Sequence, residues 1–408
     1  IIDPKTFDMS GIDTLVLSPG IPHTWPEPHP IVAKAKASGI EIVCDVELFA
    51  RAMPKARLIG ITGTNGKSTT TSLLHHILTG SGIKSQAGGN LGLPVLDFDP
   101  KPDDCVYILE MSSYQIELVR SVCFERALLL NIAPDHLDRH GGMAGYVASK
   151  MRMLTELAAL DGETVIALDD AYCAQIADRL TAGGRSVLPI STSRQLKHGV
   201  HVTMGRLMDA IGARAQHVID LTSIDSLKGA HNWQNAAAAY ALARRLGLKP
   251  DIIARQLASY PGLDHRQKPI RHIGNTVYID DSKATNAEAA AVALNSFENI
   301  YWIAGGRPKE GGFGALDPYL DKVRYAFLIG EAADDMADWI GTRTRSKVCG
   351  DLATALIEAH GAARTDSDKA VVLLSPACSS FDQFRNFEDR GRAFERLVRE
   401  LPKAEKTS

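Results

Sequence analysis

The fold of this chain is decided by one stretch, Gly60-Ile61-Thr62-Gly63-Thr64-Asn65-Gly66-Lys67-Ser68-Thr69. The apolar run Arg57-Leu58-Ile59 precedes it, and apolar residues at helical spacing follow it through Leu78. A strand, a glycine-rich turn and a helix form the context that a phosphate-binding loop requires. Backbone N–H groups of such a loop surround an anion at the positive end of the helix. The stretch therefore predicts a nucleotide-phosphate site.

The side chains of this loop agree with that prediction. Lys67 is expected to reach the terminal phosphates, and Ser68 or Thr69 can offer a hydroxyl to Mg²⁺. The strict motif has glycine where Ile61 stands, so the loop is the shorter Gly-Thr-Asn-Gly-Lys-Ser variant that begins at Gly63. A glycine turn that merely caps a helix rarely carries Gly-Lys-Ser-Thr. We predict that the nucleotide is bound by Gly63, Thr64, Asn65, Gly66, Lys67, Ser68 and Thr69.

Composition bounds the class of protein. At 408 residues the chain exceeds one core, so two or three domains are expected. A hydrophobic share of 45%, a charged share of 23% and a net charge of −3 are ordinary for a globular enzyme and indicate neither a nucleic-acid nor a membrane partner. No apolar run approaches the roughly 18–20 residues that span a bilayer. The six scattered cysteines form no C-x-x-C pair and favour a cytoplasmic location.

The order of apolar strands and helical segments predicts an α/β fold with a mainly parallel central sheet. Residues 1–50 resemble part of a small α/β domain, residues 51–262 form the phosphate-loop domain, and residues 263–408 form a second doubly wound α/β domain. Residues 195–228 look like a β-rich excursion. Ligands of such sheets bind beyond the carboxyl ends of the strands.

Polar residues follow the predicted strands of the central domain. Glu110 ends an apolar strand, where a carboxylate can hold Mg²⁺ beside a phosphate loop or simply face solvent. His136 follows the next strand beside Asp135, and its alternatives are a metal or phosphate ligand and a structural histidine. Asn232 and Asn235 share one face of a helix start, where they either bond a purine edge or cap the helix.

Three loops of the last domain carry polar groups. Asp280 to Asn286 holds two acids, a lysine and three short polar side chains, more than capping a helix needs. Gly305 to Gly312 is a glycine-rich basic loop that suits an anionic group. Ser375 to Phe384 follows the last strand and predicts a third binding loop.

Taken together, these motifs resemble the Mur ligase family, the ATP-dependent amino-acid ligases of peptidoglycan synthesis. The likeness covers nearly the whole chain. It rests on the phosphate loop, Glu110-Met-Ser-Ser, Asn-Ile-Ala-Pro-Asp-His-Leu-Asp-Arg-His, His-Asn-Trp-Gln-Asn, His265-Arg266, Asp-Asp-Ser-Lys-Ala-Thr-Asn and Ser-Pro-Ala-Cys-Ser-Ser-Phe-Asp-Gln-Phe. The last two, with the Gly-Gly-Arg-x-Lys loop, are typical of the member that adds D-glutamate.

The resemblance implies a three-domain architecture and a reaction. ATP would phosphorylate the carboxylate of UDP-N-acetylmuramoyl-L-alanine, and the amine of D-glutamate would attack the acyl phosphate through a tetrahedral intermediate. The enzyme would be a cytoplasmic monomer with ATP and two Mg²⁺ ions. The family's uridine-binding domain is longer than residues 1–50, which predicts an N-terminally shortened form. Two alternatives stay open: a related ligase with another acceptor, such as one that glutamylates folate, and an inactive nucleotide-binding protein.

The resemblance also assigns roles to residues. Lys67, Glu110, His136 and Lys150 would be catalytic, and Ser68, Glu110, His136 and Lys150, the last possibly carbamylated in this family, would be metal ligands. Asn232, Asn235, Arg266 and Asp281 would bind the nucleotide. Substrates would contact Ser18, Asn90, Ser112, Lys283, Thr285, Lys309, Ser380 and Phe387. Gln267 and Lys268 follow Arg266 where the family usually has an aromatic residue and Glu.

Overall fold

The computed structural model describes residues 7–90, 92–100, 104–308 and 312–402. The chain divides into two compact units, Ile1–Pro261 and Gly262–Ser408. The described strands form three sheets, with two, nine and six strands. This confirms the predicted α/β class. Lys309, one of the predicted substrate contacts, lies outside the described residues.

The first segment is a small β-α-β-α arrangement. Strands β1 (Thr14–Val16) and β2 (Glu41–Val43) pair in parallel, with α1 (Pro30–Ala37) between them and α2 (Asp45–Ala52) after them. The ring of Phe49 on α2 lies 5.6 Å from that of Phe98 and 5.2 Å from that of Tyr107, a residue of the nine-stranded sheet. This segment therefore shares a hydrophobic core with the rest of the first unit.

The nine-stranded sheet contains the strand before the phosphate loop, β3, between β6 and β5. Its order is β11-β10-β9-β8-β7-β6-β3-β5-β4, parallel from β4 through β9 and antiparallel for the last two pairs. The strands are β3 (Arg57–Thr62), β4 (Ser85–Gly89), β5 (Val106–Glu110), β6 (Phe124–Leu129), β7 (Ala158–Ala167), β8 (Val187–Ser191), β9 (Gly199–Thr203), β10 (Arg206–Ala210) and β11 (Gln216–Asp220). The β-rich excursion predicted for residues 195–228 corresponds to β9, β10 and β11.

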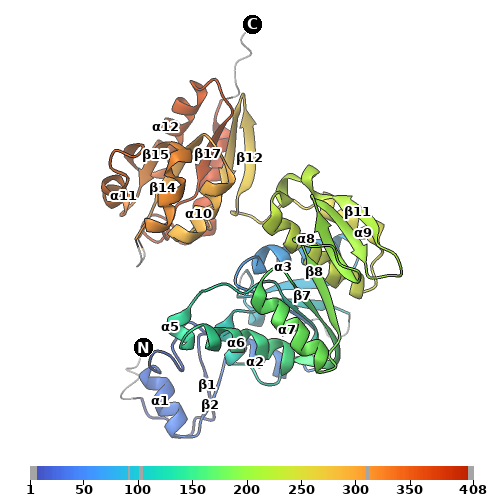
Figure 1. Ribbon diagram of the computed structural model, residues 1–408. Helices are drawn as coiled ribbons and strands as arrows, with labels where there is room; N and C mark the ends of the chain where they lie inside the picture. Colours follow the sequence, from blue (N-terminus) through green and yellow to red (C-terminus); the bar gives the residue numbers. More distant parts are fainter. Residues whose placement is uncertain (1–6, 91, 101–103, 309–311, 403–408) are drawn as a thin grey trace. The chain divides into compact units, whose positions relative to one another are not determined.

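Side chains of alternate residues on these strands pack into two separate hydrophobic cores, one on each face of the sheet. On β5, Val106 and Ile108 face one cluster, while Tyr107 and Leu109 face the other. The first cluster is covered by α3 (Lys67–Gly80), α8 (Ala230–Arg245) and α9 (Pro250–Ala258). The second is covered by α4 (Ser113–Glu117), α6 (Met143–Thr155) and α7 (Ala171–Ala182), and α5 (Leu137–His140) packs beside α6 (Figure 1). Short 3-10 turns are η1 (Val95–Asp97), η2 (Leu221–Ser223) and η3 (Asp225–Leu227).

The second unit contains the six-stranded sheet, in the order β12-β13-β17-β14-β15-β16. Only the β12–β13 pair is antiparallel. The strands are β12 (Lys268–Ile273), β13 (Thr276–Asp280), β14 (Ile300–Gly305), β15 (Val323–Ile329), β16 (Arg345–Gly350) and β17 (Ala370–Leu374). Because β17 lies between β13 and β14, three loops that are distant in sequence leave neighbouring strand ends.

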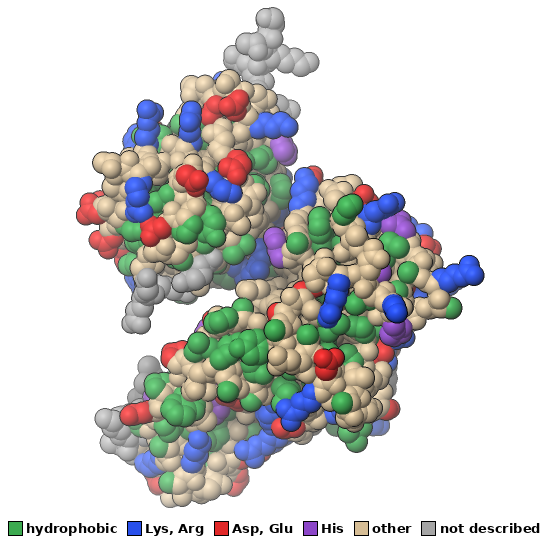
Figure 2. Space-filling view, viewed as in Figure 1, with side chains coloured by type: hydrophobic (Ala, Val, Ile, Leu, Met, Phe, Trp, Pro, Cys, Tyr) green, Lys and Arg blue, Asp and Glu red, His purple; other side chains and the backbone are tan. Residues whose placement is uncertain are grey.

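Helices cover both faces of this sheet. One core contains residues of α10 (Ala287–Ser296), η4 (Gly314–Lys322) and α11 (Ala333–Ile340), and the other contains residues of α12 (Leu352–Arg364) and α13 (Phe387–Glu400). On the face in Figure 2, positive and negative side chains are interspersed over both units. No helix among the described residues is long and apolar enough to cross a membrane.

Candidate active site

The phosphate loop leaves the carboxyl end of β3 and enters α3 at Gly66. Gly66 has φ 84°, and a Cβ built there would lie 2.2 Å from Oδ1 of Asn235. Both the left-handed backbone and the close approach require glycine. The N–H groups of the first turn of α3 have no intrahelical partner by helix geometry, so this end of the helix can bind an anion.

Neighbouring strands hold the loop in shape. The Asn65 N–H donates to Oδ1 of Asn131 at 2.8 Å, and Nδ2 of Asn131 donates back to the Asn65 carbonyl at 3.2 Å. The Thr64 hydroxyl lies 3.2 Å from the Ala133 carbonyl and 3.0 Å from the Tyr146 hydroxyl. Neither Asn131 nor Tyr146 was predicted as a site residue, although Asn131 lies in a predicted strand and opens one of the motifs on which the family resemblance rests.

Two lysines converge on one carbonyl of the loop. Nζ of Lys67 lies 2.9 Å from the Gly63 oxygen and 2.8 Å from that of Thr64, and Nζ of Lys150 lies 2.8 Å from the Gly63 oxygen. Lys150 is buried with 1% exposure, and its ammonium lies 4.7 Å over the Tyr146 ring. Burial, with the positive charge of Lys67, lowers the pKa of Lys150 well below its ordinary value. The structure thus places beside the phosphate loop a buried lysine whose amine loses its proton more readily than that of an exposed lysine.

Glu110 ends β5, the strand beside β3. Its Oε1 accepts a hydrogen bond from Nδ2 of Asn90 at 2.8 Å, while its buried Oε2 has no partner among the residues that the structure describes. A buried carboxylate oxygen without a donor is costly and suits a cation. Glu110 thus has an oxygen available for a cation; that it holds Mg²⁺ together with Ser68, which lies in the first turn of α3, stays a prediction. Among the described residues, no cluster of three or more His, Cys, Asp or Glu side chains could hold a metal.

His136 lies at the start of α5 with φ 51°. Its Nε2 is 3.4 Å from Oδ2 of Asp135, and its ring centroid is 5.0 Å from that of Tyr114. Burial, opposed by Asp135, lowers the pKa of His136. A neutral imidazole is the form that binds a metal. The left-handed backbone at a non-glycine residue also marks a strained position, which functional sites often contain.

The two asparagines of α8 lie inside the helix, whose N-cap is Gly229. Oδ1 of Asn235 accepts a hydrogen bond from the Thr70 hydroxyl at 3.2 Å, and its Nδ2 lies 3.3 Å from Oδ1 of Asn232. Asn232 in turn donates to the Lys228 carbonyl at 3.0 Å. Asn235 thus packs against the phosphate loop, and helix capping does not account for it.

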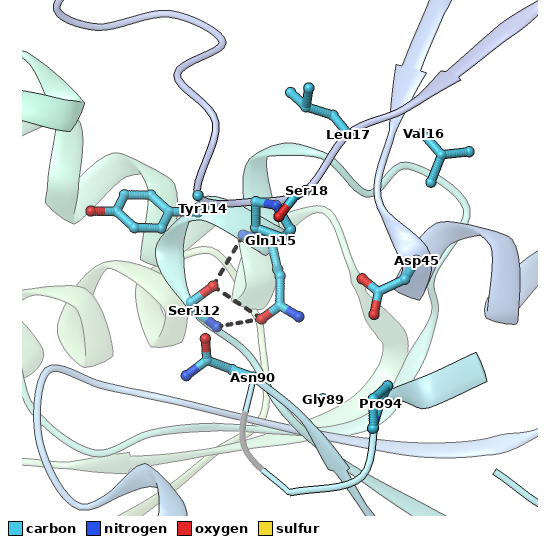
Figure 3. Close-up of a pocket in the computed structure, with 12 residues that line it drawn as sticks. Val16, Leu17, Ser18, Asp45, Gly89, Asn90, Pro94, Ser112, Tyr114 and Gln115 are labelled. Atoms are coloured by element: carbon cyan, nitrogen blue, oxygen red, sulfur yellow. Dashed lines mark hydrogen bonds between the residues drawn. The ribbon is translucent and has the colours of Figure 1, made fainter. Parts of the chain in front are cut away.

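A cavity of about 510 Å³ is lined by residues at and after the carboxyl ends of β4 and β5, within the size range of small-molecule sites. It brings together Ser18, Asn90 and Ser112, three predicted substrate contacts, from separate segments (Figure 3). Gln115 and Asp45 also line it; Gln115 and Ser112 form a capping box at the start of α4. Oδ1 of Asp45 is buried without a partner. Sequence reasoning missed Gln115 and Asp45, although Ser-x-x-Gln is a capping signal.

The polar loops of the second unit surround Asp281. The Ser375 hydroxyl donates to its Oδ2 at 2.7 Å, and the Gln267 N–H donates to its Oδ1 at 3.1 Å. Burial raises the pKa of Asp281 to about 7, against the lowering effect of Ser375 and Arg266. Capping of α10 falls to Asn286, so Asp281 is available for another role.

A buried arginine ties the three predicted loops together. Arg390 on α13 is 1% exposed and donates to the Ser282 oxygens at 3.0 and 2.9 Å, and to the Cys378 carbonyl at 3.1 Å. Longer contacts of 3.4 and 3.5 Å reach the Ser379 and Gly305 carbonyls. Burial lowers the pKa of Arg390 to about 10. No local pattern in the sequence singles out this residue.

The remaining predicted contacts are distributed over these loops. Lys283 lies with its Nζ 5.8 Å over the ring of Phe387, whose carbonyl accepts the Ser282 hydroxyl at 2.8 Å. Thr285 is half-buried just before α10, and Ser380 is buried in the loop after β17. All four therefore lie on loops at the carboxyl ends of β13 and β17 or at the start of α13.

Both a protein-family model and individual known proteins match this chain. The model of the Mur ligase middle domain matches residues 61–243. The UDP-N-acetylmuramoylalanine--D-glutamate ligase of Paramagnetospirillum magneticum is 48% identical over 399 residues, which are 98% of this chain and 86% of that protein. The protein of the same name from Rhodospirillum rubrum is also 48% identical, over 97% of this chain and 83% of its own.

Solved structures agree at the level of the fold. The MurF ligase of Thermotoga maritima, in complex with ADP, aligns with a TM-score of 0.61 and 19% identity over 98% of each chain. A MurF structure from Acinetobacter baumannii gives a TM-score of 0.60 at 20% identity, over 86% of this chain and 78% of that one. With the near-full-length identity to the curated ligases, these findings show that the chain belongs to the Mur ligase family.

Proposed function

We propose that this protein uses ATP to join D-glutamate to UDP-N-acetylmuramoyl-L-alanine in peptidoglycan synthesis. The observation that carries the proposal is the 48% identity, over 98% of the chain, to a ligase of that name. Residues 1–50, 51–262 and 263–408 would serve the uridine part of the substrate, ATP and the amino acid. The enzyme would act in the cytoplasm as a monomer.

The reaction would begin at the phosphate loop. A carboxylate oxygen of the acceptor attacks the γ-phosphorus of ATP, and the bond to ADP breaks as the new O–P bond forms. Backbone N–H groups at Gly66 and the Lys67 ammonium would hold and neutralise the phosphates. The ammonium already lies within 2.9 Å of the loop carbonyls, so a small movement brings it to an anion.

The amine of D-glutamate then attacks the acyl carbon, the C–N bond forms, and phosphate leaves with the electron pair of the C–O bond while the amine loses a proton. Thr285, Ser380, Phe387, Lys283 and Lys309 would bind this amino acid. Ser18, Asn90, Ser112 and Gln115 would orient the acceptor in the cavity. Asn232, Asn235, Arg266 and Asp281 would contact the nucleotide.

Two Mg²⁺ ions would take part in the reaction. Ser68 and Glu110 would hold one ion, and His136 with Lys150 would hold the second, where Mg²⁺ offsets negative charge on the phosphates. Lys150 would serve as a carbamate, because its buried, depressed-pKa amine can attack CO₂, form an N–C bond and release a proton. The unpartnered Oε2 of Glu110 supports the first site.

Phosphate release tests the proposal. The protein is assayed with ATP and UDP-N-acetylmuramoyl-L-alanine, and D-glutamate, L-glutamate, L-lysine and diaminopimelate are offered separately. We expect release with D-glutamate alone and its loss in Lys67→Ala, with Lys84→Ala as an exposed-lysine control. Preference for another acceptor would replace the proposal with a related ligase. ATP binding without turnover would indicate an inactive nucleotide-binding protein.

A further inference from the structure

A carboxylate in the first unit lies between two histidines from different segments. Oε1 of Glu117, at the end of α4, lies 2.8 Å from Nδ1 of His140 on α5. Its Oε2 lies 3.2 Å from Nε2 of His23, in the segment between β1 and α1. The His140 side chain is fully buried, and those of His23 and Glu117 are 11% and 22% exposed. We call His23, Glu117 and His140 the histidine latch.

The ring nitrogens define the direction of these bonds. Nε2 of His140 lies 2.9 Å from the Ser113 hydroxyl, which leaves Nδ1–H to donate to Glu117. Nδ1 of His23 is buried and has no partner among the described residues, so Nε2 carries the polar contact of this ring. One carboxylate oxygen of Glu117 thus accepts a hydrogen bond from His140, and the other lies within ion-pair distance of His23. Interactions with a charged group are stronger than those between neutral groups.

The latch faces the wall of the cavity. Arg139, next to His140, donates from Nη1 to the Gly20 carbonyl at 2.8 Å and from Nη2 to the Ile21 carbonyl at 3.3 Å. Its guanidinium also lies 4.7 Å over the ring of Tyr114. Gly20 lines the cavity, and so does Tyr114, which is labelled in Figure 3. The segment from Ser18 to His23 is therefore fastened to α5 and to α4 at two points.

The other side of the latch reaches the phosphate loop. The ring of His140 lies 5.4 Å from that of Tyr146, whose hydroxyl is 3.0 Å from the Thr64 hydroxyl. Lys150 lies over the same Tyr146 ring. One buried cluster thus contacts both the cavity wall and the residue that supports the phosphate loop.

We propose that Glu117, acting through His23 and His140, is a positioning residue that aligns the cavity wall with the phosphate loop. This inference rests on the proposed function, because alignment matters where an acceptor carboxylate must meet the terminal phosphate of ATP. Misplacement of reacting groups by about 1 Å can cost about 100-fold in rate. None of the three latch residues needs to touch a reacting atom.

Four variants separate positioning from a general loss of stability. Glu117→Ala removes the hydrogen bond to His140 and the contact with His23, and His23→Leu removes the contact on the side of the cavity wall. His23→Gln keeps an N–H donor that can reach Glu117 and serves as the conservative replacement. His75→Leu is the matched control, because His75 is a partly buried histidine of the same unit that pairs with a serine hydroxyl, Ser85 Oγ, at 2.9 Å.

Kinetic constants give the first readout. For Glu117→Ala and His23→Leu we expect the Kd of UDP-N-acetylmuramoyl-L-alanine to rise about tenfold and kcat to fall about tenfold, from the loss of a polar interaction with a charged group. The Kd of ATP should stay within about twofold, because neither change removes a group that the phosphate loop presents to ATP. His23→Gln and His75→Leu should match the parent. Equal effects of Leu and Gln at His23, or unchanged constants in both disruptive variants, would overturn the proposal.

Hydrogen exchange gives a readout that does not depend on activity. The N–H of Ile21 donates to the Ser18 carbonyl at 2.9 Å, and that of His29 donates to the Pro22 carbonyl at 2.9 Å. Peptides covering residues 17–29 should exchange faster in His23→Leu and Glu117→Ala than in His23→Gln, His75→Leu or the parent. If the parent ligates nothing, the proposed function fails, and exchange still decides whether the latch fastens this segment. Unchanged exchange would refute the latch even in an active enzyme.

Discussion

Replacing Asp281 with Asn is expected to change how the stability of the second unit depends on pH. The carboxyl is buried, and among the described residues it accepts two hydrogen bonds, from Ser375 and Gln267. An Asn side chain keeps the shape: its Oδ1 accepts the Gln267 N–H, and its Nδ2–H can donate to the Ser375 hydroxyl. The substitution therefore removes the titration of this group with little change in packing.

The magnitude follows from the pKa. Folding raises the pKa of Asp281 from 3.8 to about 7, so the folded state holds its proton more tightly than the unfolded state. The associated stability is fully present below pH 3.8, is lost as the pH rises toward 7, and changes no further above it. At about 1.4 kcal/mol per pKa unit, the loss amounts to about 4 kcal/mol. The Asn variant should match the parent near pH 4 and exceed its stability by about 4 kcal/mol at pH 8.

Urea unfolding from pH 4 to 8.5 measures this difference. Labelling with 5-fluorotryptophan lets ¹⁹F resonances follow Trp302 and Trp339 of the second unit separately from the two tryptophans of the first. Trp302 is a suitable probe because its indole N–H donates to the Ser375 carbonyl at 2.8 Å. Asp321→Asn, at an exposed carboxylate, is the control for the change in net charge. Parallel pH curves for the parent and Asp281→Asn would refute the reasoning.

Three further substitutions test the rest of the site. Gly66→Ala should weaken ATP binding, measured by calorimetry, by about tenfold or more, because the added Cβ would collide with Asn235. Gly82→Ala is the control: Gly82 has a similar φ of 81° but open space around it. This change should lower the free energy of unfolding by about 1–2 kcal/mol and leave the ATP affinity unchanged. Lys150→Met should abolish phosphate release while the melting temperature stays level or rises. The reason is that burial of the native Lys150 amine near Lys67 disfavours folding, and Met removes that cost. A clear drop in melting temperature would contradict this. Arg390→Lys should raise the KM for D-glutamate about tenfold with ATP affinity unchanged, since a lysine cannot satisfy the same carbonyls; equal changes in all constants would point to unfolding.

Much of the fold follows from sequence periodicity. The predicted strand that ends at Glu110 and the next one, which His136 follows, are present as β5 and β6, because continuous apolar runs in a parallel sheet are buried on both faces. The edge strands β12 and β16 escaped prediction. Strand β12 carries Pro269, and β16 reads Arg-Ser-Lys-Val-Cys-Gly with much of its length exposed, so neither shows an apolar run. Edge strands are partly solvated, and their pairing is decided by the neighbouring strand.

The phosphate loop was predictable because its parts are adjacent in the chain and its geometry is local. The same holds for Glu110 and Asp281, each of which ends or follows an apolar strand. The roles assigned to Lys150 and to the substrate contacts came from family resemblance, since nothing in their local sequence distinguishes a solvated helix lysine from one buried beside the loop.

The supports of the site were decided by tertiary structure alone. Lys150 meets Gly63 across 87 residues, and Arg390 meets Ser282 across 108. Glu117 contacts both His140 on α5 and His23 in the segment between β1 and α1, and the second contact forms only when that segment packs on the rest of the first unit. Local sequence patterns encode backbone geometry and strand burial, whereas the partners of a buried charged side chain depend on which segments the strand order brings together. The sequence by itself thus determined the phosphate loop and the class of sheet. The packing determined which side chains hold the phosphate loop and the cavity wall in place.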